Sequence, residues 1–264
     1  MAKILQSHSG DCEACETVAG APGSRLVLLC DHAANLVPPD YGNLGLPPEQ
    51  FARHIAYDIG ARDLTLGLAA RLGAHAVLSR FSRLLIDPNR GLDDPTLIMR
   101  ISDGAAVPGN RDVGETERRR RIARFHQPYH SAIAATLAQV QAEGHVPFLV
   151  SMHSFTPVWR GWPRPWQVGI LWDRDEAVAH AMIRGFRAQG DLMVGDNEPY
   201  HGALEGDTLN THGTRRGLPH VLIEVRQDLI ADKTGVDEWV DRVAKVIEPI
   251  MYDARRGAHR RWRC

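Results

Sequence analysis

Short apolar runs alternate along this chain with longer stretches of helical periodicity, a pattern typical of an α/β protein. The apolar runs have the length of buried strands, and they lie at residues 26–30, 75–78, 84–86, 148–150, 168–172 and 221–223. Helical spacing is predicted over residues 49–72, 115–143, 176–189 and 236–251, with a break near Pro128 in the second stretch. Because strands and helices alternate, we predict a three-layer α/β/α fold with a central mixed, largely parallel sheet.

The chain reads as one unit, because no internal repeat and no low-complexity linker divides it. We therefore predict a single domain over residues 1–264, with an N-terminal arm at 1–23 and a basic tail at 254–264. A chain of this length buries most of the surface that its unfolded form exposes, so it needs no disulfide or metal staple to fold.

Polar residues follow four of the predicted strands. They are Asp31-His32, the Asp87-Pro88-Asn89-Arg90 segment, His153 and Glu224. Open α/β sheets bind ligands beyond the carboxyl ends of their strands. These residues are therefore the candidates for a site at one edge of the sheet.

Charge and composition narrow the possible partners only slightly. The chain has 31 Lys+Arg against 32 Asp+Glu, a net charge of −1, which argues against a basic nucleic-acid coat or an acidic disordered tail. Only three of these cations are lysines, at Lys3, Lys233 and Lys245, and the rest are arginines. The chain also has 13 histidines. A GC-rich genome accounts for much of the arginine excess, so positions along the chain must decide which residues carry chemistry.

The sequence also leads us to expect no secretory signal, no membrane span and no structural zinc site. The N-terminal residues lack the apolar core of a secretory signal, and no apolar stretch is long enough to span a membrane, so we expect a cytoplasmic protein without a membrane partner. The lone pair Cys12 and Cys15 lacks the two further ligands of a structural zinc site, and we expect free thiols. The arginine run at 118–121 is interpreted as a solvated helix face, and no nucleic-acid partner is expected.

Two histidines are the first candidates for metal ligands. His32 and His153 each follow an apolar run, and neutral imidazole is a preferred zinc ligand. A catalytic zinc usually takes three protein ligands. Asp58 is the leading third candidate, and His54, four residues earlier on the same predicted helix face, is the alternative.

The other strand ends offer groups for substrate binding and proton transfer. Arg90 presents a planar fork suited to a carboxylate, Asn89 adds amide groups, and Arg83 is close enough in sequence to support the same anion; a simple capped turn is the alternative interpretation. Glu224 ends a run that is predicted to be buried, and desolvation would raise its pKa toward the range of a general base. Pairing of Glu224 with Arg226 is the alternative. The polar loop at 197–213, which contains His212, is a candidate binding loop.

Several motifs in this order resemble the N-formylglutamate amidohydrolase family, from about residue 26 to about residue 228. The motifs that carry the resemblance are Cys30-Asp31-His32-Ala33-Ala34-Asn35, Tyr57-Asp58-Ile59-Gly60, Ser82-Arg83-Leu84-Leu85-Ile86-Asp87-Pro88-Asn89-Arg90, Ser151-Met152-His153-Ser154, Thr211-His212-Gly213 and Ile223-Glu224-Val225-Arg226. The family is similar in fold to zinc carboxypeptidases, with their phosphorylase/hydrolase-like architecture, and to aspartoacylase-like enzymes.

The resemblance implies a metal-dependent amidohydrolase. One zinc ion, or another divalent metal, would be bound by His32, Asp58 and His153. The substrate carboxylate would be bound by Asn89 and Arg90, with Arg83 and His212 as further substrate-binding candidates, and Glu224 would be the general base. The implied substrate is a small anionic N-acyl amino acid, above all N-formyl-L-glutamate, which would yield formate and the amino acid.

One departure keeps other functions open. The carboxypeptidase-like pattern has glutamate as the fourth residue of its first motif, and Asn35 stands there in this chain. The carboxylate ligand must therefore come from elsewhere. The alternatives are a metal-free carboxylate-binding protein of the same fold, a zinc peptidase, and a deacylase for another N-acyl amino acid.

Overall fold

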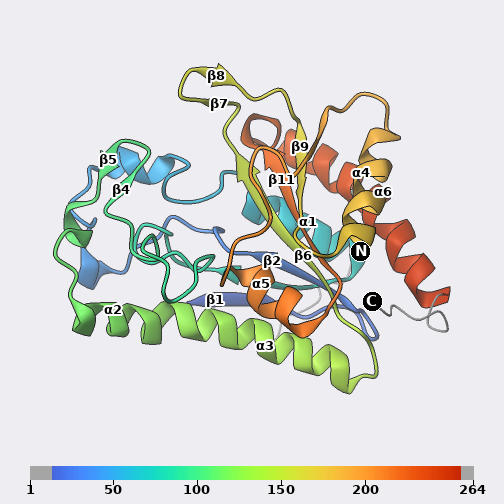
Figure 1. Ribbon diagram of the computed structural model, residues 1–264, viewed down its shortest axis with the longest axis horizontal. Coiled ribbons are helices and arrows are strands. Elements are labelled where there is room, and N and C mark those ends of the chain that lie inside the picture. Colours follow the sequence, from blue (N-terminus) through green and yellow to red (C-terminus); the bar gives the residue numbers. More distant parts are fainter. Residues whose placement is uncertain (1–13, 257–264) are drawn as a thin grey trace, which may run out of the picture.

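A seven-stranded mixed sheet forms the centre of the computed structural model, which describes residues 14–256 (Figure 1). The strand order is β1-β3-β2-β6-β11-β9-β10. The strands are β1 (Cys15–Val18), β2 (Leu26–Cys30), β3 (His75–Ser79), β6 (Phe148–Phe155), β9 (Val168–Leu171), β10 (Val194–Asp196) and β11 (His220–Arg226). Neighbouring strands are parallel except for the pairs β1–β3 and β11–β9, so the prediction of a mixed, largely parallel sheet is confirmed.

Helices cover both faces of this sheet, as predicted for three layers (Figure 1). One face packs against α1 (Ala61–Leu72), α4 (Glu176–Arg187) and α6 (Lys233–Arg256). The other face packs against α3 (Gln127–Ala142), which continues from α2 (Glu115–Arg121) through a π-helical turn at Ile122–His126. The predicted break near Pro128 therefore takes the form of this π turn. A short helix, α5 (Thr208–His212), interrupts the predicted polar loop, and two small hairpins are formed by β4 (Ile101–Ser102) with β5 (Ala105–Ala106) and by β7 (Val158–Trp159) with β8 (Trp162–Pro163).

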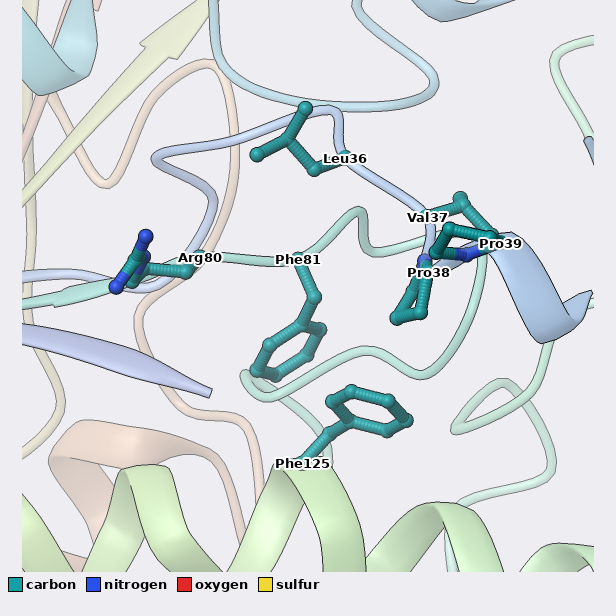
Figure 2. Close-up of a pocket in the computed structure, with 7 residues that line it drawn as sticks. All are labelled: Leu36, Val37, Pro38, Pro39, Arg80, Phe81 and Phe125. Atoms are coloured by element: carbon teal, nitrogen blue, oxygen red, sulfur yellow. The ribbon is translucent and has the colours of Figure 1, made fainter. Parts of the chain in front are cut away.

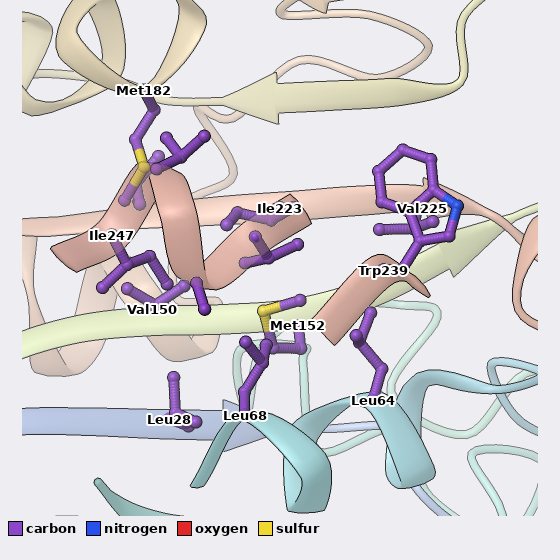
Figure 3. Packing of buried hydrophobic residues seen from close by; sticks show 14 of the residues in the cluster. Leu28, Leu64, Leu68, Val150, Met152, Met182, Ile223, Val225, Trp239 and Ile247 are labelled. Atoms are coloured by element: carbon purple, nitrogen blue, oxygen red, sulfur yellow. The ribbon is translucent and has the colours of Figure 1, made fainter. Parts of the chain in front are cut away.

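Side chains alternate along each strand between two apolar layers, because successive residues point to opposite faces of a sheet. In β2, Leu28 packs into the layer with α1 and α6, whereas Leu29 belongs to the layer with α3. Figure 3 shows the first layer, in which Leu28, Val150 and Ile223 from three strands meet Leu68 and Trp239 from two helices. The same alternation directs Asp31, His153 and Glu224 toward the α3 side of the sheet.

Two of the catalytic candidates lie within strands rather than after them. β6 extends to Phe155 and β11 to Arg226, so His153 and Glu224 are paired neighbours in the parallel register. The apolar runs in these two strands are shorter than the strands themselves, because polar side chains face the α3 side over residues that still pair through the backbone. Among the described helices, none is long and apolar enough to cross a membrane.

Two predicted elements were wrong. The arm at 1–23 contains β1, which pairs with β3 at the edge of the sheet; residues 1–13, including Cys12, lie outside the described part of the chain, as does the tail beyond 256. Residues 84–86 form buried turns instead of a strand, and the backbone nitrogen of Asp87 donates to the carbonyl of Leu97. A short apolar run cannot be distinguished from a buried turn by periodicity alone.

The helix predicted over 49–72 begins only at Ala61. Before it lie a 3-10 turn at Pro48–Ala52 and a loop that contains both His54 and Asp58. Gly60 ends this loop with φ +79°, a left-handed conformation that prevents helix continuation, and a Cβ there would lie 2.1 Å from the carbonyl oxygen of Ile230. His54 and Asp58 therefore do not share a helix face.

Replacement of Gly60 by alanine tests this constraint on the Asp58 loop. We expect Gly60→Ala to lower the free energy of unfolding, measured by urea titration, by clearly more than the matched variant Gly217→Ala. Gly217 is also left-handed, with φ 62° and ψ 28°, but a Cβ there would meet nothing within 4 Å, so its cost is limited to roughly 1–2 kcal/mol of backbone strain. Equal losses in the two variants would show that the close approach to Ile230 is unimportant.

Candidate active site and metal centre

His32, Asp58 and His153 come together at the carboxyl end of the sheet. They form a buried group whose potential ligand atoms all lie within 4.8 Å of one another. The Oδ2 atom of Asp58 is 2.8 Å from Nδ1 of His153 and 3.4 Å from Nδ1 of His32. The backbone holds Asp58 in place, since its nitrogen donates to the carbonyl of His32 and its Oδ2 accepts from the backbone nitrogen of Ser154.

Each of the two histidines is oriented by a second buried carboxylate. Nε2 of His32 lies 2.7 Å from Oδ1 of Asp87, and Nε2 of His153 lies 3.1 Å from Oδ2 of Asp31. An ionised carboxylate only accepts hydrogen bonds, so both Nε2 atoms carry protons and donate them. In neutral imidazoles the Nδ1 lone pairs then face Asp58, and this outer-shell arrangement is the one that orients histidines toward a metal.

Hydrogen bonds from three separate elements hold Asp31. Its Oδ1 accepts from the hydroxyls of Tyr129 on α3 and Thr208 on α5, at 2.9 and 2.6 Å, and its Oδ2 accepts from Ser151 on β6 at 3.0 Å. Burial raises the pKa of Asp31, but the bonds and charge of His153 together with the Thr208 hydroxyl outweigh it and place the pKa well below the usual range. Asp31 is therefore an anion held in a fixed position.

Negative charge exceeds positive charge in this buried group. Asp31, Asp58 and Asp87 are at most 5% exposed, and Arg83 supplies one guanidinium, which donates through Nε and Nη2 to Asp87 and lies 3.6 Å from Asp58. With both histidines neutral, three carboxylates and one arginine leave two negative charges. An uncompensated buried charge is costly, so the group needs either proton uptake or a divalent cation.

Protonation of His153 illustrates this need. Burial lowers the pKa of His153, yet its hydrogen bonds to Asp31 and Asp58 raise it well above the usual value. Two acceptors only 2.8 Å apart, Nδ1 of His153 and Oδ2 of Asp58, require a positive centre between or beside them. The donor set, two imidazole nitrogens and a carboxylate oxygen, is one that zinc uses in catalytic sites.

Glu224 lies beside His153 on the neighbouring strand. The residue is 6% exposed, and its Oε2 atom has no hydrogen-bond partner among the described residues. Burial first, and then the negative charge of Asp58, raise the pKa of Glu224 to about 7. A carboxylate in this condition can exchange a proton near neutral pH. The alternative pairing does not occur, because Arg226 binds Asp228 instead.

Asn89 and Arg90 of the Asp87–Arg90 turn have hydrogen-bond donors that contact no carboxylate of the described chain. Oδ1 of Asn89 accepts from the backbone of Thr208, whereas its Nδ2 donates to no described residue. Arg90 donates from Nε to Thr96 and from Nη1 to the carbonyl of Asn89, and forms no ion pair within residues 14–256. Arg83, by contrast, is occupied by Asp87.

The remaining candidates lie apart from this group. His54 is 3.4 Å from Asp103 and does not join His32 and His153, so Asp58 rather than His54 is the third group beside them. His212 stacks on His130, with Nε2 2.8 Å from Nδ1 of His130, and its own Nδ1 is buried without a partner among the described residues. Nε2 of His130 in turn donates to the carbonyl oxygen of Pro88 at 2.9 Å, next to the substrate-binding candidates.

Comparison with known proteins relates this chain to a family. A family model for N-formylglutamate amidohydrolase matches residues 24–231, a span that contains every candidate above. The chain belongs to the N-formylglutamate amidohydrolase family. No curated protein matches the chain.

Two solved structures share the fold of this amidohydrolase. A gene product from Agrobacterium tumefaciens is 34% identical, with a TM-score of 0.85, and the match covers 91% of this chain and 97% of that one. An N-formylglutamate amidohydrolase from Ralstonia eutropha is 21% identical, with a TM-score of 0.73, and the match covers 94% of this chain and all of that one, 100%. The second likeness concerns the fold alone.

Sequence reasoning missed the two carboxylates that orient the histidines. The sequence motifs contain Asp31 and Asp87 but assign no role to either, whereas the structure places them against His153 and His32. Asp31 directly follows a strand on the same face as His153, which is the signal that could have identified it. The contact of Asp87 with His32 spans 55 residues and had no local signal.

A separate pocket in this amidohydrolase has no catalytic chemistry. It encloses about 300 Å³ and is lined by Leu36, Val37, Pro38, Pro39, Arg80, Phe81 and Phe125 (Figure 2). The lining contains no acid, histidine or cysteine, so it offers neither a metal ligand nor a nucleophile.

The buried histidines near Pro88 predict a pH-dependent stability. Burial first, and then the charge of His130, lower the pKa of His126 to about 4 and that of His212 to about 3, from 6.5 in the unfolded chain. The unfolded chain therefore binds more protons below pH 6.5, and this contribution to stability, complete above that pH, is lost as the pH falls. We expect a loss of roughly 1–2 kcal/mol per histidine between about pH 7 and pH 5.

Urea unfolding of the wild type and of a variant with His126→Gln and His212→Gln, at both pH values, measures this loss. All other titrating groups are common to both proteins, so the difference between their unfolding free energies isolates the two histidines. The stability advantage of the wild type should shrink as the pH falls. A difference that stays constant would contradict their neutral burial.

Proposed function

We propose that this amidohydrolase cleaves N-formyl-L-glutamate, or a similar small N-acyl amino acid, to formate and the amino acid with the help of one zinc or other divalent ion. The observation that carries the proposal is the convergence of His32, Asp58 and His153, in which buried carboxylates fix both histidines with Nδ1 toward Asp58. Family membership supports amide hydrolysis, and the excess of buried negative charge supports a divalent cation.

The metal would be held by Nδ1 of His32, Nδ1 of His153 and a carboxylate oxygen of Asp58. When bound, it supplies Lewis-acid activation of water and of the scissile carbonyl. Asp31 and Asp87 keep the proton of each imidazole on Nε2 and thereby leave both Nδ1 atoms as ligands.

Glu224 is the group that moves the proton. Its carboxylate takes a proton from the water as the oxygen attacks the formyl carbon, and then delivers that proton to the leaving amine nitrogen as the carbon–nitrogen bond breaks. A pKa raised to about 7 by burial suits both steps, because the group exchanges protons readily near neutral pH. The products are formate and the free amino group of the amino acid.

Asn89 and Arg90 are proposed to bind the α-carboxylate. Nδ2 of Asn89 and the guanidinium of Arg90 have no acidic partner in the described chain, and the bonds of Arg90 to Thr96 and to its own backbone hold the guanidinium in position. A carboxylate bound there would orient the formyl group toward the metal ligands. Arg83 has a different part, since its Nε and Nη2 both donate to Oδ2 of Asp87 and so orient the carboxylate that holds His32.

The variant Glu224→Gln tests the proton transfer. We expect it to retain the metal and to lose about 10²–10⁴-fold in kcat on N-formyl-L-glutamate, because the amide cannot accept the proton. The matched control is Glu143→Gln, an exposed position just beyond α3, which should keep full activity. Full activity of the metal-loaded Glu224→Gln protein would exclude Glu224 as the base.

Metal analysis and a substrate panel in the same experiment separate the alternatives. Stoichiometric metal in the purified protein argues against a metal-free carboxylate-binding protein. Formyl, acetyl and peptidyl substrates distinguish a deformylase from another deacylase or a peptidase.

The variant Asp31→Asn tests how the histidines are oriented. We expect it to weaken zinc binding by about 10–100-fold, measured by competition with a chromophoric chelator, because His153 loses the acceptor that fixes its tautomer. Asp40→Asn, which alters a carboxylate bound by Arg120 and Arg124 on the surface, is the control and should bind zinc like the wild type. Unchanged affinity in Asp31→Asn would contradict the role assigned to Asp31.

A further inference from the structure

Neutral groups hold the guanidinium of Arg164 in position, and it has no acidic partner among the described residues. Its Nη1 donates to the hydroxyls of Thr156 and Tyr200, at 3.1 and 3.0 Å, and no carboxylate of residues 14–256 pairs with it. Its guanidinium carbon also lies 4.9–5.7 Å from the ring centres of Tyr200, Trp159 and Phe155. Nε and Nη2 donate to no described residue, so two of its donor groups are left for a ligand.

The contacts of Arg164 place it beside the two strands that carry His153 and Glu224. It follows the β7–β8 hairpin, which projects beyond the strand ends in Figure 1. Thr156, which binds its guanidinium, comes three residues after His153 and directly follows β6. Nη1 of Arg226, two residues after Glu224 on β11, lies 3.4 Å from the carbonyl oxygen of Arg164.

The loop that carries Tyr200 brings Arg164 toward the part of the sheet that holds Glu224. Gly169 pairs with Glu224 in the sheet, and a Cβ on Gly169 would lie 2.0 Å from the carbonyl oxygen of Glu198. The missing side chain thus lets the loop that carries Tyr200 lie against β9, beside Glu224. Partial burial, followed by the charge of Glu224, raises the pKa of the Tyr200 phenol, which agrees with this closeness.

Two other arginines near the site differ from Arg164 because each pairs with a carboxylate. Arg83 is neutralised by Asp87 and Arg226 by Asp228. Arg90 has no carboxylate partner in the described chain, but it lies on the Asp87–Arg90 turn and is already assigned to the α-carboxylate. A substrate with two carboxylates needs a second cation of this kind, and bidentate arginine–carboxylate pairs are among the stronger polar contacts.

We infer that Arg164 binds the side-chain carboxylate of an acidic N-acyl amino acid and so determines specificity for it. This inference rests on the proposed function, and it names a residue that none of the motifs identified. Thr156 and the aromatic rings hold the guanidinium in position before the substrate arrives, which lowers the entropy cost of binding.

The test compares N-formyl-L-glutamate with N-formyl-L-glutamine, which differ in the side-chain charge. We expect Arg164→Gln to lower kcat/KM for the glutamate substrate roughly 10–100-fold, mostly through KM, and to leave the glutamine substrate within about threefold. Arg164→Lys should restore part of the preference because it keeps the charge. Arg160→Gln, an exposed arginine of the same hairpin, removes the same charge and should change neither substrate.

The preference is a ratio within each variant, so partial unfolding of a variant does not affect it. Equal losses on both substrates would overturn the inference, since they would indicate contact with the α-carboxylate or the scissile carbonyl. An unchanged ratio would overturn it as well.

Calorimetric binding of L-glutamate and L-glutamine tests Arg164 without turnover. The wild type should prefer glutamate, and Arg164→Gln should lose that preference while Arg160→Gln keeps it. A wild type that turns over neither formyl substrate would contradict the proposed function, and the calorimetric preference would still decide the role of Arg164. Absence of any binding preference that depends on Arg164 would overturn the inference.

Discussion

The buried excess of negative charge around His32 and His153 is the constraint on which the rest of the site depends. Three carboxylates lie within the protein with one guanidinium to balance them. Such a group is stable only when a positive charge joins it, from protons on the histidines or from a cation. The same carboxylates orient both histidines, so charge balance and ligand geometry have one cause.

This arrangement also ties distant parts of the chain together. Asp31 follows β2 and accepts hydrogen bonds from α3, β6 and α5, while Asp58 is bound by the loop after β2 and by the end of β6. Each bond satisfies a buried charge that would otherwise destabilise the fold. The fixed positions of His32, Asp58 and His153 are therefore a consequence of satisfying these carboxylates.

Positive charge is distributed differently in the same region. Arg83 neutralises Asp87 and thus belongs to the framework, whereas Arg90 and Arg164 are held by neutral acceptors and have no acidic partner among the described residues. A guanidinium held in this manner is available to an anionic ligand without the prior loss of an ion pair. The three arginines therefore differ in the charge of their partners, a difference that their positions in the sequence do not show.

The sequence by itself determined the layers of the fold and most of the site. Apolar runs of strand length located β2, β3, β6, β9 and β11, since a strand buried on both faces must be apolar almost throughout. The motifs at the strand ends also identified His32, His153 and Glu224 as candidates, because an open sheet brings its carboxyl ends together.

Only the tertiary structure decided how these residues act on one another. Gly60 ends the loop of Asp58 through contact with Ile230, a residue far along the chain, and so removes the helix face that periodicity predicted. The contact between Asp58 and His153 joins residues 95 positions apart in the sequence, and that between Tyr129 and Asp31 joins residues 98 positions apart. Local pattern specifies which residues are buried, but the pairing of buried charges depends on long-range contacts that form only when the layers pack.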